Sequence, residues 1–511
     1  MDQKKIIIIG GGISGLSAGV YAQKNGYEAT IIEMHDKPGG QLTAWDRSGY
    51  RFDYCLHWLV GTDHGVYYDI WNEIGAMDQR TEVINHPIFV KIQDEQHGEF
   101  YIYNDLDEWE AYLIQMAPED ESAIAKLCRM MRKSDQLDQF DDPPELRSFF
   151  DYFKSFVKMG SFFPILIRYG KSTAKELFDH VGLTNERVRY FLAKLYEGRD
   201  FSALGLIMMM GWAHAKNAGY LKGGSNRMTQ RIAATYRGLG GKFLYNSAVK
   251  EIIVENDQAK GVTLRNGEHY FADYVISACD GHAVLYDMLK GNYLTKKLQD
   301  AYETWPLFTP LVMIGFGIDD EIASPAHNTN YYPTDTLHIG STQTAGYSIM
   351  NRSMYDEAFA PAGKTTLLLQ FESPWELWQD LEGDGYLKEK SAIRQKAIEL
   401  LEQHYPNITE KIEIIDIATP KTTARYTGVW KGAYEGFMPS KNVMNGLPME
   451  LDGLKNFMMI GQWLFPGGGL PPSAQSGKWA IQKITHAEGK EFVVDRMPGK
   501  KHEQRDSLTT S

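Results

Sequence analysis

The chain opens with an alternation of apolar runs and helical periodicity. Residues 5–9 are a lysine followed by four isoleucines, a β-branched run typical of a strand buried on both faces of a parallel sheet. Helical spacing of apolar residues follows from Ser14 to Asn25, and a second strand-like run covers residues 29–33. A strand–helix–strand unit of this kind predicts a doubly wound α/β fold with a parallel sheet.

Strand-like runs return far along the chain, separated by long stretches of different character. These runs cover residues 243–254, 275–278 and 457–460. Because one sheet can collect strands from distant parts of a chain, we predict a single discontinuous, Rossmann-like cofactor domain. Its segments are residues 1–75, 215–285 and 415–490.

The two intervening segments differ in pattern from the cofactor domain. Residues 76–214 are helix-like and rich in aromatic residues and methionine, whereas residues 286–414 mix helical spacing with strand-like runs such as 311–316 and 365–371. Together they predict an inserted α+β substrate domain. Residues 491–511 are polar with little periodicity, which predicts a flexible tail.

Composition and charge narrow the class of protein. With 511 residues, 43% hydrophobic and 23% charged, the chain is long enough for two packed domains and has no apolar run that would span a bilayer. A net charge of -13 without a basic cluster disfavours nucleic acid as a partner. Cys55, Cys128 and Cys279 lack disulfide or metal-ligand spacing, so we expect no metal site. We also expect no cleavable signal peptide, and a cytoplasmic protein.

A glycine-rich turn follows the first strand. In the spacing of Gly10, Gly12 and Gly15, the first glycine permits a tight turn, the second admits a pyrophosphate to the backbone, and the third lets helix and strand pack closely. The N-terminus of the following helix presents unpaired N–H groups to the diphosphate. Glu33 ends the second strand, where a carboxylate accepts hydrogen bonds from ribose hydroxyls. Neighbours predicted to contact the same cofactor are Ile13, Ser14 and Met34.

Two further glycine segments favour FAD over NAD as the cofactor. Gly39 and Gly40 are followed by Gln41, and this pair predicts a second close approach of backbone to the dinucleotide. Near the C-terminus a strand, a glycine-rich loop and a helix over residues 473–484 follow each other again. The positive end of that helix would favour negative charge on the pyrimidine side of a flavin. Loop residues predicted to contact the cofactor are Gly461, Gln462, Gly468, Gly469 and Leu470.

These motifs, with the Gly-Tyr-Arg-Phe-Asp stretch at 49–53, resemble the phytoene desaturase, carotenoid isomerase and retinol saturase family of FAD-dependent oxidoreductases. The resemblance covers both ends of the chain and residues 222–280, where Val249 lies in a segment similar to the strand that contacts adenine. It implies an amine-oxidase-type fold, one non-covalently bound FAD, and redox or isomerisation chemistry on a long polyene-like lipid. The two insertions match the family only in size and character.

Three positions depart from the family pattern. Gln462 stands where many members have an aspartate, and its amide can still donate and accept hydrogen bonds. Gln41 stands where an arginine often follows the glycine pair, and Cys55 takes the place of the glycine in the usual Asp-x-Gly pattern. Cys55 is interpreted as a small packed side chain near the cofactor, with a redox thiol or a flavin attachment point as the alternative.

Two apolar segments of the first insertion each have two interpretations. Residues 149–171 combine apolar residues with a basic fringe, which fits either a peripheral membrane contact that gates entry of a lipid or a core helix pair with solvated lysines. Residues 201–215 form either core or the wall of a long apolar tunnel. His57 and His214 lie in candidate pocket segments, but a lone histidine is more often a packing residue, so no catalytic acid or base is assigned.

The sequence therefore predicts that bound FAD exchanges a hydride with an apolar small-molecule substrate. The expected substrate is a long polyene or isoprenoid-type lipid, and the expected reaction is desaturation, saturation or cis/trans isomerisation of carbon–carbon double bonds. A flavin amine or amino-acid oxidase of the same fold is the first alternative, and it requires a polar pocket with an anchoring charge and an aromatic cage. A non-enzymatic lipid-binding escort protein is the alternative from another class, and the intact glycines and Glu33 disfavour it.

Overall fold

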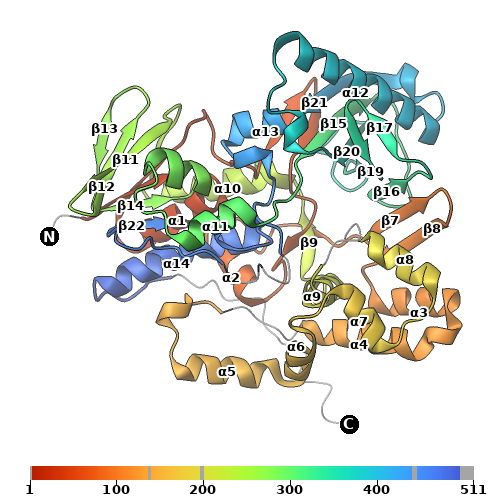
Figure 1. The fold of residues 1–511 in the computed structure, drawn as a ribbon, viewed down its shortest axis with the longest axis horizontal. Helices are drawn as coiled ribbons and strands as arrows, with labels where there is room; N and C mark the ends of the chain where they lie inside the picture. Colours follow the sequence, from red (N-terminus) through yellow and green to blue (C-terminus); the bar gives the residue numbers. More distant parts are fainter. Residues whose placement is uncertain (1–2, 136–139, 196–200, 440–442, 444–445, 495–511) are drawn as a thin grey trace.

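The computed structural model describes residues 3–135, 140–195, 201–439, 443 and 446–494. In the view of Figure 1, a parallel sheet and its helices lie on the left, a second sheet with a long covering helix lies at the upper right, and a group of helices lies at the lower right. The chain thus has the predicted α/β architecture with an inserted α+β part.

The first sheet contains five parallel strands in the order β10-β2-β1-β14-β22. The strands are β1 (Lys5–Ile9), β2 (Glu28–Ile32), β10 (Lys242–Leu244), β14 (Tyr274–Ser277) and β22 (Phe457–Met459). The four isoleucines of β1 are all buried, as expected for a central strand covered on both faces. The predicted parallel sheet, assembled from distant segments, is confirmed.

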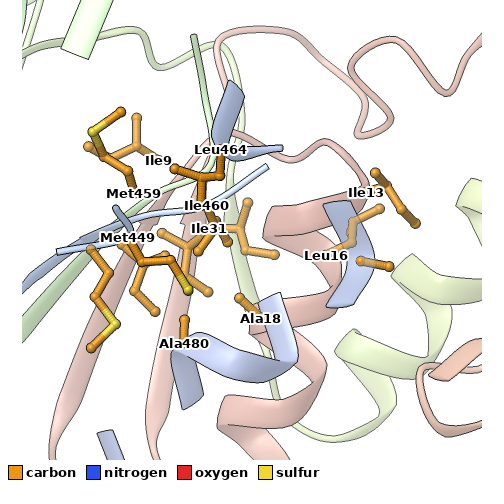
Figure 2. Packing of buried hydrophobic residues seen from close by; sticks show 14 of the residues in the cluster. Ile9, Ile13, Leu16, Ala18, Ile31, Met449, Met459, Ile460, Leu464 and Ala480 are labelled. Atoms are coloured by element: carbon orange, nitrogen blue, oxygen red, sulfur yellow. The ribbon is translucent and has the colours of Figure 1, made fainter. Parts of the chain in front are cut away.

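Helices α1 (Ile13–Lys24) and α14 (Leu470–Ala487) pack closely beside this sheet. A Cβ atom added to Gly477 would lie 2.6 Å from the Ser14 carbonyl oxygen, so only glycine fits this crossing. The Ser17 hydroxyl donates a hydrogen bond of 2.7 Å to the Ala474 carbonyl across the same contact. Figure 2 shows buried side chains of this region, among them Ile9, Leu16, Ala18, Ile31 and Ala480. The contact holds the N-terminal turns of both helices in fixed positions.

The run at 243–254 belongs to two different sheets, contrary to the single strand-like run in the sequence. β10 ends at Leu244, and Asn246 then has a positive φ of 51°, which ends the strand. The chain continues into a separate antiparallel sheet. The strands of that sheet are β11 (Val249–Glu255), β12 (Gln258–Leu264) and β13 (His269–Phe271).

A seven-stranded sheet in the order β21-β15-β20-β19-β16-β7-β8 forms the second lobe. Its strands are β7 (Ile88–Asp94), β8 (Gly98–Tyr103), β15 (Leu311–Ile318), β16 (Asn328–Tyr332), β19 (Tyr347–Asn351), β20 (Thr365–Glu372) and β21 (Ile412–Ala418). Helix α12 (Gly383–His404) packs on it through Ile393, Ala397 and Leu400. The β7–β8 hairpin comes from the first insertion, which has a helix-like pattern, so both insertions contribute to this sheet.

The first insertion also supplies the helices along the bottom and at the lower right of Figure 1. They are α3 (Leu106–Met116), α4 (Glu121–Ser134), α5 (Phe149–Met159), α6 (Phe163–Tyr169), α7 (Ala174–Val181), α8 (Glu186–Lys194) and α9 (Ala203–His214). Helices α4 and α9 pack against each other in a core that contains Leu127, Met131, Ile207 and Met210. Among the described residues, no helix is both long enough and apolar enough to cross a membrane.

Shorter elements connect these layers. The remaining strands are β3 (Ala44–Arg47), β4 (Tyr50–Asp53), β5 (Leu59–Val60), β6 (Val83–Ile84), β9 (Ala218–Leu221), β17 (Leu337–Ile339) and β18 (Thr342–Thr344). The remaining α-helices are α2 (Gly65–Glu73), α10 (Gly224–Gly238), α11 (Lys296–Thr304) and α13 (Pro420–Thr427). Strand β9 pairs with both β5 and β6.

The predicted domain division fits this arrangement with one change. β21 extends to Ala418 and belongs to the seven-stranded sheet, so we propose that the substrate domain continues to that residue rather than to 414. At the other end, Val493 exchanges two backbone hydrogen bonds with the Asn25 side chain, of 2.7 and 3.0 Å. Residues 491–494 therefore lie against α1, and the rest of the predicted tail lies outside the described residues.

Candidate active site

A large cavity extends between the two sheets. Its volume is about 1480 Å³, above the ~300–1,000 Å³ typical of pockets for one small molecule. One part of its wall is formed by the β1–α1 turn, the second glycine pair and the N-terminus of α14. The rest is formed by β15, β16, β19, β20 and α9. The cavity thus has room for a dinucleotide and a second ligand.

The three glycines of the first turn have different environments. Gly10 has a φ of 99°, a conformation that favours glycine. A Cβ atom added to Gly15 would lie 2.0 Å from the Gly10 carbonyl oxygen, so this position must be glycine for α1 to pack on the turn. A Cβ atom added to Gly12 would meet only the Gly39 carbonyl oxygen, at 3.9 Å. Gly12 also precedes α1 without a side-chain cap, so the first amides of the helix are left for a ligand.

Glu33 holds the first turn and also faces the cavity. Its Oε2 accepts a hydrogen bond of 2.7 Å from the Gly11 amide, and its Oε1 accepts one of 2.9 Å from the His35 amide. The side chain is buried, yet the residue lines the cavity. Because a carboxylate has about four acceptor sites, two of them stay available for ribose hydroxyls.

We expect Glu33→Gln to weaken FAD binding by about 1–3 kcal/mol, or about 5- to 150-fold in Kd. Glutamine keeps one acceptor oxygen but presents an NH2 group where the carboxylate accepts from an amide or a ribose hydroxyl. Fluorescence titration of apoprotein with FAD measures the change, with circular dichroism as the control for folding. Glu33→Arg is a poorer choice, since it removes both amide contacts from the turn. An unchanged Kd in Glu33→Gln would contradict the role assigned to this residue.

The second glycine pair lies directly against the first turn. The Gly39 amide donates a hydrogen bond of 2.8 Å to the Gly11 carbonyl. A Cβ atom added to Gly40 would lie 3.2 Å from the Gly12 Cα atom, and the φ of Gly40 is 58°. Gln41 donates its side-chain amide to the Ala433 carbonyl at 3.1 Å. Gln41 therefore ties this pair to a segment almost four hundred residues later.

The C-terminal glycine loop brings a helix N-terminus to the cavity. Gly461 and Gly468 have φ values of 107° and 48°, and the Gly461 amide donates a 2.9 Å hydrogen bond to Ser476 Oγ. Helix α14 then begins at Leu470 with no side-chain cap, and its first residues line the cavity. The partial positive charge of this helix end is thus directed at the cavity, as the sequence predicts.

The structure brings nearly all of the predicted cofactor residues to one wall. Fifteen of the sixteen line the cavity, including Val249 at the start of β11. The exception is Gly15, which packs against the Gly10 carbonyl as expected for the third glycine. Binding of FAD by these residues stays a prediction, and the open space at Gly12 and the uncapped helices are the features that fit it.

The stretch at 49–53 helps to hold the wall of the cavity in place. The fully buried Asp53 carboxylate accepts hydrogen bonds of 2.7 and 2.6 Å from the amide and hydroxyl of Ser225, at the start of α10. Cys55 follows and lines the cavity. Burial raises the pKa of the Cys55 thiol to about 12, so the reactive thiolate is disfavoured. This favours the interpretation of Cys55 as a packed side chain.

The two candidate histidines have different environments. His57 lines the cavity, and burial together with the charge of Arg352 lowers its pKa to about 4. The neutral ring lies 2.9 Å from the Cys55 carbonyl through Nδ1. Because a carbonyl only accepts, Nδ1 carries the proton and Nε2 is an acceptor toward the cavity. His214 instead accepts the Leu106 amide at 3.1 Å through Nδ1, which is a structural contact at the start of α3.

Aromatic residues and methionine make up much of the wall on the side of the seven-stranded sheet, beside polar residues such as Asn330, Gln343 and Gln370. The aromatic residues and methionines are Trp58, Tyr190, Phe201, Met209, Trp212, Met313, Tyr332, Met350 and Phe371. Both interpretations of residues 201–215 are correct for different faces of α9: Met209 lines the cavity, while Ile207 and Met210 are fully buried in the core.

Sequence reasoning missed every charged residue of the wall except Glu33, and Arg352 and Glu435 are two of those missed. Arg352 follows β19, and its guanidinium donates a 3.0 Å hydrogen bond to the Asp53 carbonyl and lies 3.4 Å from the Asp53 carboxylate. Glu435 lies in the segment that connects α13 to β22. Neither belongs to a short motif, because contacts made by the folded chain bring each of them to the cavity. In the described part of the chain, no group of three or more His, Cys, Asp or Glu residues is arranged to hold a metal ion.

Comparisons with known proteins agree with this geometry. The family model described as "Flavin containing amine oxidoreductase" matches residues 13–480. The chain is 24% identical to the prolycopene isomerase of Daucus carota over 94% of its own length and 79% of the relative's. It is 23% identical to a 4,4'-diapophytoene desaturase of Methylomonas sp, over 95% and 96% of the two chains. A putrescine oxidase structure covers 95% of this chain, and 99% of its own chain is matched, with a TM-score of 0.56 at 12% identity.

The likeness to putrescine oxidase shows the fold, which is the amine-oxidase type that the sequence predicts. The family match covers most of the chain; it begins just after Gly10, Gly11 and Gly12 and includes the second glycine pair and the C-terminal glycine loop. Bound FAD would supply hydride transfer at this site. The chain belongs to the flavin-containing amine oxidoreductase family and is an FAD-dependent oxidoreductase of the phytoene desaturase-like group.

Proposed function

We propose that this enzyme uses FAD to desaturate, saturate or isomerise carbon–carbon double bonds of a long apolar polyene or isoprenoid-type lipid. The observation that carries the proposal is the lining of the cavity, which joins the glycine turns to a wall that contains many aromatic and methionine side chains. The curated relatives are named for prolycopene and 4,4'-diapophytoene, which supports a substrate of this class.

In this proposal the protein binds and orients the cofactor and the lipid, and it excludes water from the cavity. Residues of the glycine turns and of the α14 N-terminus line one part of the cavity and bind the cofactor there. Met209 and Trp212 of α9 and Met350 of β19 contact the lipid part. An apolar chain gains roughly 25 cal/mol for each Å² that it buries, before the cost of ordering, so affinity should fall progressively as the substrate is shortened.

The test is an anaerobic substrate panel with FAD-loaded enzyme. The panel contains isoprenoid polyenes, retinoids, unsaturated fatty acids, amines and amino acids, each tested with oxidised and with dithionite-reduced enzyme. Desaturation bleaches oxidised flavin, saturation reoxidises reduced flavin, and isomerisation changes the retention time of the lipid without changing its mass. Turnover confined to amines or amino acids would contradict the polyene assignment and leave the flavoenzyme assignment intact.

Helix α5 carries the exposed apolar surface that a membrane contact requires. A capping box of Ser148 and Asp151 begins the helix. Figure 1 shows α5 along the lower edge of the molecule, away from both sheets. Exposed side chains of α5 and α6 are Phe149, Phe150, Tyr152, Phe153, Phe156, Val157 and Ile167. Because α6 packs on α9, which lines the cavity, we propose that this surface contacts a membrane where the lipid enters.

We expect Phe149→Asp combined with Phe150→Asp to abolish flotation of the protein with liposomes. Both side chains are 78% exposed, so charge at these positions opposes interfacial burial without disturbing the core. Phe162 is unsuitable for this test, because it is fully buried. Leu387→Asp on α12, at an exposed apolar position far from α5, is the matched control and should float like the wild type. If the wild type floats with neither neutral nor anionic vesicles, the membrane proposal is wrong.

A further inference from the structure

Glu435 provides a carboxylate on the cavity wall. The folded chain fixes the position of this residue, but no described residue balances its charge. The residue lines the cavity, and no hydrogen bond or ion pair engages its side chain in the described residues. Glu435 is half-buried, so its carboxylate keeps contact with the open space of the cavity. A carboxylate that the protein itself does not pair is available to a ligand there.

The backbone around Glu435 is held from three sides. The Gly436 carbonyl accepts a 3.1 Å hydrogen bond from the Phe308 amide, and the Phe437 carbonyl accepts one of 2.8 Å from the Gly467 amide. On the other side, the Gln41 side chain donates to the Ala433 carbonyl at 3.1 Å. These contacts join the segment to the second glycine pair, to the C-terminal glycine loop and to the strand region before β15. The Glu435 side chain is therefore presented from a fixed backbone.

The C-terminal glycine loop packs closely against the segment around Glu435. A Cβ atom added to Gly468 would lie 2.1 Å from the Glu435 carbonyl oxygen, so a residue with a side chain does not fit there. Gly468 is two residues before α14, whose positive end is directed at the cavity. Glu435 therefore adjoins the loop that leads into α14, and its neighbour Tyr434 packs against the cluster that contains Met313 and Met350.

The titratable and charged groups near Glu435 are neutral or paired with other residues, so Glu435 can both bind and release a proton. Burial raises the pKa of Tyr54 and of Cys55, and the negative charge of Glu435 adds a smaller increase to each. Both groups are therefore neutral near neutral pH. Arg352 acts on Cys55 but is paired with Asp53, and Gln462 on the neighbouring loop carries no charge. Burial raises the pKa of Glu435 to about 7, so the acid and the carboxylate are both populated near neutral pH.

We propose that Glu435 exchanges a proton with the substrate carbon adjacent to the carbon that exchanges a hydride. This inference rests on the proposed function. In desaturation, two C–H bonds break: one hydrogen leaves with its electron pair to oxidised FAD, and the other leaves as a proton to the Glu435 carboxylate. The electron pair of the second C–H bond becomes the new double bond. Saturation is the reverse, with reduced FAD as the hydride donor and the Glu435 acid as the proton donor.

The same group serves an isomerisation without net redox change. Protonation of one double-bond carbon by the Glu435 acid would leave a cation delocalised over the polyene, and the bond can rotate before the proton returns to Glu435. General acid–base catalysis works best when the pKa of the group lies near the working pH. Each of the three candidate reactions therefore needs one exchangeable proton at this position.

The first test needs no substrate. In wild-type apoprotein, infrared spectroscopy should show C=O stretching intensity of protonated carboxyls that titrates near neutral pH. Glu435→Gln should lose the component near pH 7 while keeping that of Asp280, whose pKa burial raises to about 6. Because the folded pKa is raised, the protonated acid stabilises the fold at low pH, and this contribution is lost as pH rises through about 7. Glu435→Gln should therefore gain melting temperature relative to the wild type between about pH 5 and about pH 8. Glu399→Gln, at an exposed position of α12, should show neither change.

The second test uses the substrate identified by the panel. Glu435→Gln should lower the rate of the chemical step about 100-fold or more and remove the pH dependence near 7, while Glu435→Asp should keep part of both. In the wild type, the rate should rise through that pH for desaturation and fall for saturation or isomerisation. FAD content by absorbance should stay unchanged in both variants.

The outcomes separate this inference from the proposed function. If no polyene reacts but the Glu435 carboxyl component titrates and an alternative substrate shows the same pH profile, the polyene assignment fails and the role of Glu435 stands. A full rate in Glu435→Gln overturns the proton-transfer role. So does a lowered rate with an unchanged pH profile, since that result indicates a structural role. Carboxyl intensity that titrates identically in the wild type and in Glu435→Gln between about pH 5 and about pH 8 overturns it whatever the substrate is.

Discussion

Gly12→Val should yield a folded protein that binds no FAD. Gly12 has φ and ψ of -70° and -178°, a conformation that valine adopts readily, and its Cβ would meet only one protein atom, at 3.9 Å. The added methyl groups would occupy the space in front of the α1 amides where the pyrophosphate binds. We expect a loss of more than about 100-fold in affinity, or about 2.7 kcal/mol. The flavin-to-protein absorbance ratio of the purified variant measures it.

A second glycine provides the matched control for this variant. Gly238 at the end of α10 is exposed, and an added Cβ has no neighbour within 4 Å. Gly238→Val should keep wild-type flavin content, whereas Gly15→Val should fail to fold, because its Cβ overlaps the Gly10 carbonyl. A Gly12→Val protein with a wild-type absorbance ratio would show that the pyrophosphate lies elsewhere.

Local chemistry explains why the cofactor wall could be predicted from the sequence. The roles of Gly10, Gly12 and Glu33 depend on backbone conformations and hydrogen bonds within about thirty residues, and the structure places them as the spacing indicates. The C-terminal loop could be predicted for the same reason, since glycines before a helix permit positive φ and leave room for a ligand beside the first amides of the helix. Long-range packing against α1 through Gly477 needed the structure.

The lipid side of the cavity could not be predicted, because tertiary contacts alone decide which side chains face it. Phe149 and Phe162 occur in one aromatic segment, yet Phe149 is 78% exposed and Phe162 is fully buried. Burial thus places Phe162 in the core, while the membrane contact of the exposed part of residues 149–171 stays a prediction. Arg352 and Glu435 have no local pattern, and only the folded chain shows that Arg352 is paired with Asp53, while no residue that the structure describes pairs with the Glu435 side chain.

Helix α14 depends on a buried ion pair that the sequence pattern did not reveal. The Lys478 ammonium lies 2.9 Å from the Glu73 carboxylate and 2.6 Å from that of Asp141. Lys478 and Glu73 side chains are 1% and 2% exposed, and the Tyr21 hydroxyl also donates to Glu73. The cluster therefore joins α14 to α2 and α1, which carry or adjoin the cofactor wall.

We expect Lys478→Met to destabilise the protein by about 3–5 kcal/mol, because it leaves the Glu73 carboxylate buried without a cation. Methionine has a similar length, so lost packing contributes little. The urea midpoint followed by circular dichroism should fall, and FAD should be released at lower urea than in the wild type, since the N-terminus of α14 loses an anchor. Adding Glu73→Gln to Lys478→Met should recover most of the stability, because the buried charge is then removed, and Asp141 keeps contact with water at 29% exposure. A single variant as stable as the wild type would show that the ion pair contributes nothing; a double variant no better than the single would show that the loss comes from packing.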